Sequence, residues 1–102
     1  MDENILELIN RRERQLLVHS YLYYALDESI IADRDFDLWS KEMAEMMSKY
    51  PEEFKASEFY TGFVGFDGSS GFDLPYRSPE IVNRAKHLLQ YHKKLRAQGR
   101  AV

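Results

Sequence analysis

Aromatic and acidic side chains lie close together between residues 23 and 37. Tyr23 and Tyr24 fall near the end of a predicted helix, and the first turn of the next predicted helix contains Asp33, Phe36 and Asp37. Because Asp33 and Asp37 are four residues apart, they share one face of that helix. Aromatic faces attract cations, and carboxylates bind positive charge, amide groups and hydroxyl groups. The pattern therefore indicates a site for a flat, cationic heteroaromatic ligand.

A purely structural interpretation accounts for the same residues. Asp33 would then be a helix cap, Asp37 a solvated acid, and the two tyrosines part of the core. Spacing alone favours this structural interpretation over a binding site.

The elements that would position these side chains are helices. From residue 2 to about residue 26, apolar side chains recur at steps of three and four, as on one face of an α-helix, with Asp2 as the N-cap. Residues 27–32 break this period and form a connector. A second helix is predicted from Asp33, as its N-cap, to the residue before Pro51, and Pro51 opens a short helical turn.

The segment 59–76 has a different composition. It holds four of the five glycines and many aromatic residues, and its stretch 66–71, Phe-Asp-Gly-Ser-Ser-Gly, is typical of a turn. Ser78, Pro79 and Glu80 then predict the start of a last helix, which Gly99 ends. Its inward face would consist of Ile81, Ala85, Leu88, His92 and Leu95. The sequence thus predicts one mainly α domain, residues 1–102, with three main helices and a short β-hairpin or ordered aromatic loop before the last.

Charge is unevenly distributed over the 102 residues, although the net charge is only −3. Residues 1–80 hold 8 basic and 17 acidic side chains, whereas residues 81–102 hold 6 basic and no acidic ones. The basic set could contact a phosphate backbone or an acidic partner. A solvated helix whose last cations complement the helix dipole is the favoured alternative, so direct contact with nucleic acid stays open. The basic residues are Arg84, Lys86, Lys93, Lys94, Arg96 and Arg100.

Composition excludes several classes of site. Without cysteine, the chain has no disulfide, zinc–thiolate site or iron–sulfur cluster. The three histidines are not spaced as a metal motif, so no metal is expected. Neither a signal peptide nor a membrane span is predicted, and the expected location is the cytoplasm.

Three blocks of sequence together resemble the N-terminal helical domain of bacterial NAD-dependent DNA ligases. The blocks are Tyr-Leu-Tyr-Tyr-Ala-Leu-Asp at 21–27, Asp-Arg-Asp-Phe-Asp at 33–37 and Tyr-Pro-Glu at 50–52. A fainter match continues with Thr-Gly-Phe-Val-Gly at 61–65, so the similarity covers about residues 10–65. The rest, 66–102, would be a turn and an added basic C-terminal helix.

This resemblance implies a ligand and site residues. In the family, the domain holds the nicotinamide mononucleotide half of NAD while a lysine of the next domain attacks the adenylyl phosphate. The positions that contact nicotinamide would be Tyr23, Tyr24, Asp33, Phe36 and Asp37. Phe36 departs from the family pattern, which has tyrosine there, and so loses a hydroxyl group.

The resemblance also implies that this chain is not itself an enzyme. The family's nucleophile lies in a Lys-x-Asp-Gly motif, and the only Asp-Gly here, Asp67-Gly68, lacks the lysine. We therefore expect a non-catalytic, ligase-related module of nucleic-acid metabolism, of a kind that suits a phage or mobile element.

An alternative is a protein-interaction module. It would dock on a DNA ligase nucleotidyltransferase core and complement or inhibit it, with no working nucleotide pocket. Tyr23, Asp33 and Asp37 favour nucleotide binding, whereas Phe36, the aromatic segment 59–76 and the basic helix favour the interaction module. An independent NAD-consuming enzyme is disfavoured, because no nucleophile or acid–base pair is arranged for it.

Overall fold

The first helix packs against most of the other helices of the fold. The computed structural model describes residues 1–97, and its helix α1, Glu3–Ser20, is capped by Asp2, whose Oδ1 accepts hydrogen bonds from the backbone N–H groups of Asn4 and Ile5. The helix predicted to run to about residue 26 continues as a π-helical turn, η1, Tyr21–Ala25. Asp27 ends it with a positive φ of 54°, a conformation that aspartate tolerates better than most residues.

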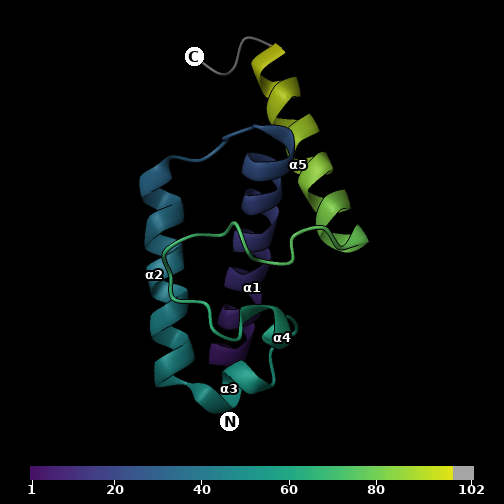
Figure 1. Ribbon diagram of the computed structural model, residues 1–102. Coiled ribbons are helices and arrows are strands. Elements are labelled where there is room, and N and C mark those ends of the chain that lie inside the picture. The colour runs from purple at the N-terminus through teal and green to yellow at the C-terminus, as the bar shows by residue number, and fades with distance from the viewer. Residues whose placement is uncertain (98–102) are drawn as a thin grey trace.

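Helix α2, Asp33–Lys49, runs back beside α1 (Figure 1). Its N-cap is Ala32 and no side chain caps it, so the prediction that Asp33 is the cap was wrong. The extended backbone falls one residue earlier, which makes Asp33 the first helical residue. Pro51 ends α2 as predicted and begins the short helix α3, Pro51–Lys55.

The segment 59–76 is an ordered loop. Within the described residues it contains no strand; it has one short helix, α4, Tyr60–Phe63, followed by turns, so the hairpin alternative was wrong. This loop crosses the molecule over α2 and α1 (Figure 1). At Gly68 the φ angle is +84°, and a Cβ atom there would lie 3.0 Å from the Ser40 carbonyl oxygen, so the loop passes directly against α2.

Helix α5, Pro79–Ala97, packs on α1 and η1 through its first turns. The Ser78 hydroxyl accepts a hydrogen bond from the Ile81 N–H, as expected of a cap. Ile81 and Ala85 are buried, but Leu88 is 36% exposed, so the predicted inward face is buried only in its first half. The helix extends past the end of η1, where no other helix among residues 1–97 lies against it (Figure 1). The predicted stop at Gly99 lies outside the described residues.

The core lies between α1, α2 and the first half of α5. Its fully buried side chains include Ile9, Leu16, Leu22, Met43 and Phe63, in keeping with the mainly α fold that the sequence predicts. No helix among residues 1–97 is long and apolar enough to cross a membrane.

Candidate functional site

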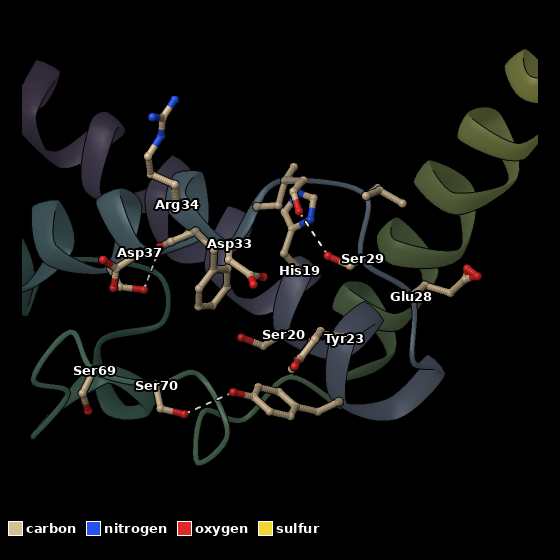
Figure 2. Close-up of a pocket in the computed structure, with 15 residues that line it drawn as sticks. His19, Ser20, Tyr23, Glu28, Ser29, Asp33, Arg34, Asp37, Ser69 and Ser70 are labelled. Atoms are coloured by element: carbon tan, nitrogen blue, oxygen red, sulfur yellow. Dashed lines mark hydrogen bonds between the residues drawn. The ribbon is translucent and has the colours of Figure 1, made fainter. Parts of the chain in front are cut away.

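A cavity of about 490 Å³ lies where η1, the connector 26–32 and the start of α2 meet. Its fourth side is formed by the loop at Ser69 and Ser70 (Figure 2). All five residues predicted from the sequence to form the binding site line this one cavity. They are Tyr23, Tyr24, Asp33, Phe36 and Asp37.

The aromatic wall of the cavity is built by η1 and the loop. Tyr23 and Tyr24 pack edge to face with ring centroids 4.9 Å apart, and Tyr24 stacks on Tyr76 at 6.0 Å. The Tyr24 hydroxyl lies 3.2 Å from Ser70 Oγ, which joins η1 to the loop. Because Tyr23 is 51% exposed, its interpretation as a core residue was wrong, whereas Tyr24 is partly buried and packs against the core. This wall presents aromatic surface to any planar group in the cavity.

The acidic side of the cavity is at the start of α2. Asp33 and Asp37 are both exposed, and Asp33 is not used as a helix cap. Asp37 Oδ2 lies 3.1 Å from Lys41 Nζ, an ion pair between exposed side chains. Such pairs are weak, so the carboxylate remains available to a ligand. The positive end of the α2 dipole also favours negative charge here.

Sequence reasoning missed ten of the fifteen cavity residues, among them His19, Ser20, Ser69 and Ser70. The two loop serines reach the site because the 66–71 segment folds back over it, which no local pattern indicates. His19 lies 5.5 Å from the Trp39 ring, and burial lowers the pKa of its imidazole to about 4. The ring is therefore neutral at neutral pH.

The predicted cationic residues lie apart from the cavity, on α5. Arg84 pairs with Glu80 at 3.4 Å, and Lys93 lies 3.9 Å from Glu28, one of the cavity-lining residues. The others on the described part of α5 are exposed: Lys86, Lys94 and Arg96. Arg100 lies outside the described residues. The described members of the basic set therefore lie outside the cavity lining, and Lys93 contacts it through Glu28.

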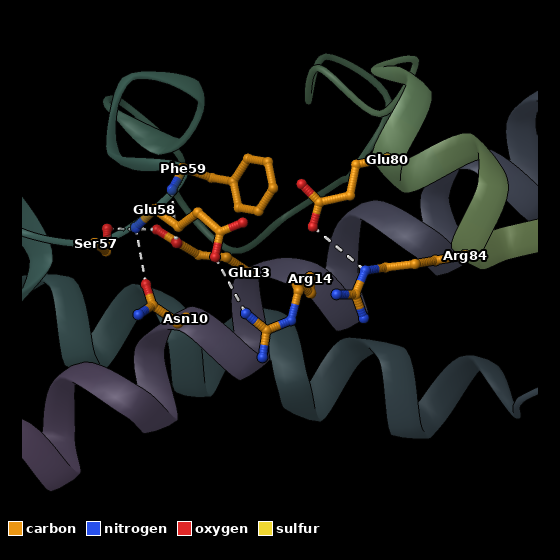
Figure 3. Close-up of polar contacts among 8 residues, drawn as sticks. All are labelled: Asn10, Glu13, Arg14, Ser57, Glu58, Phe59, Glu80 and Arg84. Carbon is orange, nitrogen blue, oxygen red and sulfur yellow. Dashed lines mark hydrogen bonds and ion pairs between the residues drawn. The ribbon is translucent and has the colours of Figure 1, made fainter.

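A second polar cluster surrounds Glu13 of α1 (Figure 3). The Glu13 carboxyl is completely buried; its Oε1 accepts a hydrogen bond from the Phe59 N–H at 3.0 Å, and its Oε2 lies 2.8 Å from Ser57 Oγ. Nearby, the Arg14 side chain pairs with Glu58. Burial is the main reason that the pKa of Glu13 rises to about 7. Sequence analysis did not single out Glu13, because its partners are far away in the chain.

No group of three or more potential metal ligands occurs among residues 1–97. The cavity combines aromatic rings, carboxylates and hydroxyl groups with one guanidinium group, that of Arg34. It is suited to hold a planar cation bearing hydroxyl groups, and none of its described residues forms a metal centre.

Comparison with known proteins identifies the family. The family described as "DNA ligase-like, N-terminal NAD+-binding domain" matches residues 2–57, more than half of the chain. The DNA ligase of Petrotoga mobilis is 30% identical over 98 residues, covering 91% of this chain and 14% of the ligase. The DNA ligase of Flavobacterium johnsoniae is 43% identical over 51 residues, 50% of this chain and 8% of the ligase. That of Fervidobacterium nodosum is 26% identical over 107 residues, 100% of this chain and 16% of the ligase.

No solved structure matches the chain. The chain spans about one-sixth or less of the length of these ligases. The matched region, 2–57, includes η1, the connector and α2, which provide the aromatic and acidic walls of the cavity. The chain belongs to the family of DNA ligase-like, N-terminal NAD+-binding domains.

Proposed function

We propose that this chain binds the nicotinamide mononucleotide half of NAD in the cavity between η1 and α2. One observation carries the proposal: the five side chains chosen from the sequence line a single cavity. A volume of about 490 Å³ falls within the range of roughly 300–1,000 Å³ that small-molecule sites occupy.

The chemistry of the lining residues supports this ligand. The faces of Tyr23, Tyr24 and Phe36 suit a cationic pyridinium ring, which aromatic rings attract. Carboxylates accept hydrogen bonds but cannot donate them, so Asp33 and Asp37 suit the ribose hydroxyl groups and an amide N–H. Their negative charge also complements the ring.

We propose further that the chain acts without catalysing adenylation. Its 102 residues contain no Lys-x-Asp-Gly motif, which in ligases supplies the nucleophile. The chain would then bind and orient the dinucleotide, and another protein domain would perform the chemistry. Incubation with NAD labelled in the adenylyl group, followed by denaturing electrophoresis, should give no labelled band at the mass of the chain. A stable labelled band would overturn this assignment.

Calorimetric titration with nicotinamide mononucleotide, NAD and AMP tests the binding proposal. We expect the first two to bind and AMP, which lacks the nicotinamide ring, not to bind. Chemical-shift mapping should place the changes at Tyr23, Tyr24 and Phe36. Changes confined to α5, or no binding at millimolar nicotinamide mononucleotide, would contradict the proposal.

A second candidate function rests on α5. Beyond Ala85 this helix carries an exposed apolar pair, with Leu88 at 36% and Tyr91 at 61% exposure, beside its basic side chains. Such a surface fits docking onto a DNA ligase nucleotidyltransferase core. Mixing the chain with a ligase that lacks its own N-terminal domain, and measuring both binding and nick sealing, tests this. Tyr91→Ser should weaken the association, and absence of any binding would exclude it.

A further inference from the structure

Two buried serines line the cavity, and only one of them has a hydrogen-bond partner. Ser40, which is 1% exposed, donates from Oγ to the Phe36 carbonyl oxygen at 3.0 Å. Ser20 is fully buried, and no group among residues 1–97 forms a hydrogen bond with its Oγ. Buried hydroxyl groups almost always have a partner in folded proteins, because leaving one unpaired is unfavourable. The free hydroxyl of Ser20 therefore requires a specific explanation.

Ser20 and the ring of Phe36 both lie close to Gly71. A Cβ atom built on Gly71 would lie 2.1 Å from Ser20 Oγ and 3.0 Å from Phe36 Cζ. Cζ is the carbon on which a tyrosine would carry its hydroxyl group. The Ser20 hydroxyl thus lies near the end of the ring at which residue 36 lacks a hydroxyl, and Gly71 approaches both so closely that no side chain fits at position 71. Figure 2 shows Ser20 between Asp33 and Ser70, on the cavity wall.

Most other hydroxyl groups of the cavity have a contact within the protein, and the Tyr23 hydroxyl, which has none among residues 1–97, belongs to a side chain that is 51% exposed. Tyr24 and Ser70 contact each other at 3.2 Å, and the Ser40 proton is donated to a backbone carbonyl. Asp33 and Asp37 can only accept hydrogen bonds as carboxylates. A ligand carbonyl oxygen needs a donor, and Ser20 has the buried hydroxyl of the described cavity wall whose proton is not in use.

We propose that the Ser20 hydroxyl donates a hydrogen bond to the carboxamide oxygen of the nicotinamide ring, replacing the hydroxyl that Phe36 lacks. This inference rests on the proposed function and adds a specificity residue to it. A ring stacked on Phe36 directs its in-plane substituents toward the edge of the Phe36 ring, where Ser20 lies. Ser20 would thereby select a ring bearing a carboxamide over the unsubstituted ring.

Access to the Ser20 hydroxyl requires a small movement of the loop. Ser20 has no exposed surface, and Gly71 lies directly against it. The exposed Tyr24–Ser70 contact holds this part of the loop to η1 across the cavity. Gly71 is also buried, and its carbonyl oxygen accepts a hydrogen bond from the Leu74 N–H at 3.1 Å, so a ligand that reaches Ser20 must displace residues 69–71 against both contacts.

A cycle that combines a variant with a modified ligand tests the proposal. Calorimetry compares nicotinamide mononucleotide with the ribotide of unsubstituted pyridine, which keeps the charge, ribose and phosphate but lacks the carboxamide. Ser20→Ala should weaken binding of nicotinamide mononucleotide about three- to tenfold, the equivalent of one hydrogen bond, and leave binding of the pyridine ribotide unchanged. Phe36→Tyr, added to Ser20→Ala, should restore the lost selectivity.

Ser40→Ala is the matched control. It removes a second buried hydroxyl from the same wall but one that already has a partner, so the ratio of the two affinities should not change. If Ser20→Ala weakens both ligands equally, or neither, the inference is wrong although the proposed function stands. If the unmodified chain binds neither ligand at millimolar concentration, the proposed function itself is wrong and the inference fails with it. Should Ser20→Ala not fold, equal affinity of the unmodified chain for the two ligands would still overturn the inference.

Discussion

Helix α1 buries two polar side chains seven residues apart, Glu13 and Ser20, which differ in whether they have hydrogen-bond partners. Both are 0% exposed. Every oxygen of Glu13 lies within hydrogen-bond distance of Ser57 or Phe59, whereas Ser20 Oγ has no partner among residues 1–97. Glu13 faces the 57–59 segment (Figure 3), and Ser20 faces the cavity (Figure 2). Equal burial therefore does not imply equal surroundings: the Glu13 carboxyl contacts a distant segment of the chain, and the Ser20 hydroxyl has no partner among residues 1–97.

The single hydroxyl proton of Ser57 indicates the protonation state of Glu13. Ser57 Oγ lies 2.8 Å from Glu13 Oε2 and 2.6 Å from the Phe54 carbonyl oxygen, but its single proton cannot be donated to both. A protonated Glu13 resolves this, because its hydroxyl donates to Ser57 Oγ and Ser57 donates to Phe54. The raised pKa of Glu13, about 7, agrees with this arrangement.

The largest expected effect is the loss of stability when Glu13 is replaced. Glu13→Ala leaves the buried Phe59 N–H without an acceptor and opens a cavity, so the free energy of unfolding should fall by about 2–4 kcal/mol. Urea denaturation at pH 5.5, where Glu13 is protonated, measures this change. A loss below about 0.5 kcal/mol, the size expected of surface substitutions, would show that Glu13 does not fasten the 57–59 segment.

A second prediction concerns pH. In the folded chain the pKa of Glu13 is about 7, above its ordinary value of 4.5, so the folded state binds a proton more tightly than the unfolded state does. The stability that this proton confers is complete below pH 4.5 and is lost as the pH rises to about 7. Glu13→Gln keeps an uncharged donor and acceptor at every pH. It should match the unmodified chain near pH 4.5 and exceed its stability at pH 8 by up to about 3 kcal/mol.

The titration of His19 changes the stability with pH in the direction opposite to that of Glu13. Burial lowers the pKa of its imidazole from 6.5 to about 4, so its contribution is complete above pH 6.5 and is lost as the pH falls to 4. This effect is the same in the unmodified chain and in Glu13→Gln, and it cancels in their difference. If that difference is independent of pH, the assignment of a neutral, buried Glu13 is wrong.

The third prediction concerns ligand binding in the cavity. Asp37→Ala should weaken binding of nicotinamide mononucleotide by about 1.5–3 kcal/mol, tenfold to a hundredfold, because a charge-assisted contact is lost. Its stability should change by no more than about 0.5 kcal/mol, since Asp37 is exposed. Lys41→Ala is the matched control: it breaks the same ion pair without removing the carboxylate from the cavity. Equal loss of affinity in both variants would show that the pair, and not the carboxylate, matters.

Local signals explain what the sequence could predict. Asp2, Pro51 and Ser78 determine helix ends through their own backbone and side-chain chemistry, and each end was predicted close to where it occurs. The five predicted site residues line one cavity because they lie at adjoining ends of two consecutive helices. Connected ends lie close together in any helical hairpin, so local order was enough to place them in one cavity.

The remaining features depend on contacts between distant segments. Ser69 and Ser70 reach the cavity, and Ser57 reaches Glu13, only when the 57–71 region folds back over α1 and α2. Periodicity places Glu13 and Ser20 on the same helix face as the buried Ile9 and Leu16, but it does not indicate whether either polar side chain finds a partner. Asp33 shows a different limit, since the cap moved to Ala32 although aspartate is the better capping residue.

The smallest expected effect is the change in stability of Ser20→Ala, and it tests the comparison of Glu13 with Ser20 most directly. Removing a buried hydroxyl that has no partner costs no hydrogen bond and relieves a desolvation penalty, so the free energy of unfolding should stay within about 0.5 kcal/mol or rise. Ser57→Ala is the matched control on the other side, because its buried hydroxyl contacts both Glu13 and the Phe54 carbonyl oxygen. That variant should lose about 1–2 kcal/mol. Urea denaturation of the two alanine variants, without ligand, gives the answer. If Ser20→Ala is destabilised as much as Ser57→Ala, the Ser20 hydroxyl is already bonded in the free protein, and the surroundings of Glu13 and Ser20 do not differ in the way inferred from the structure.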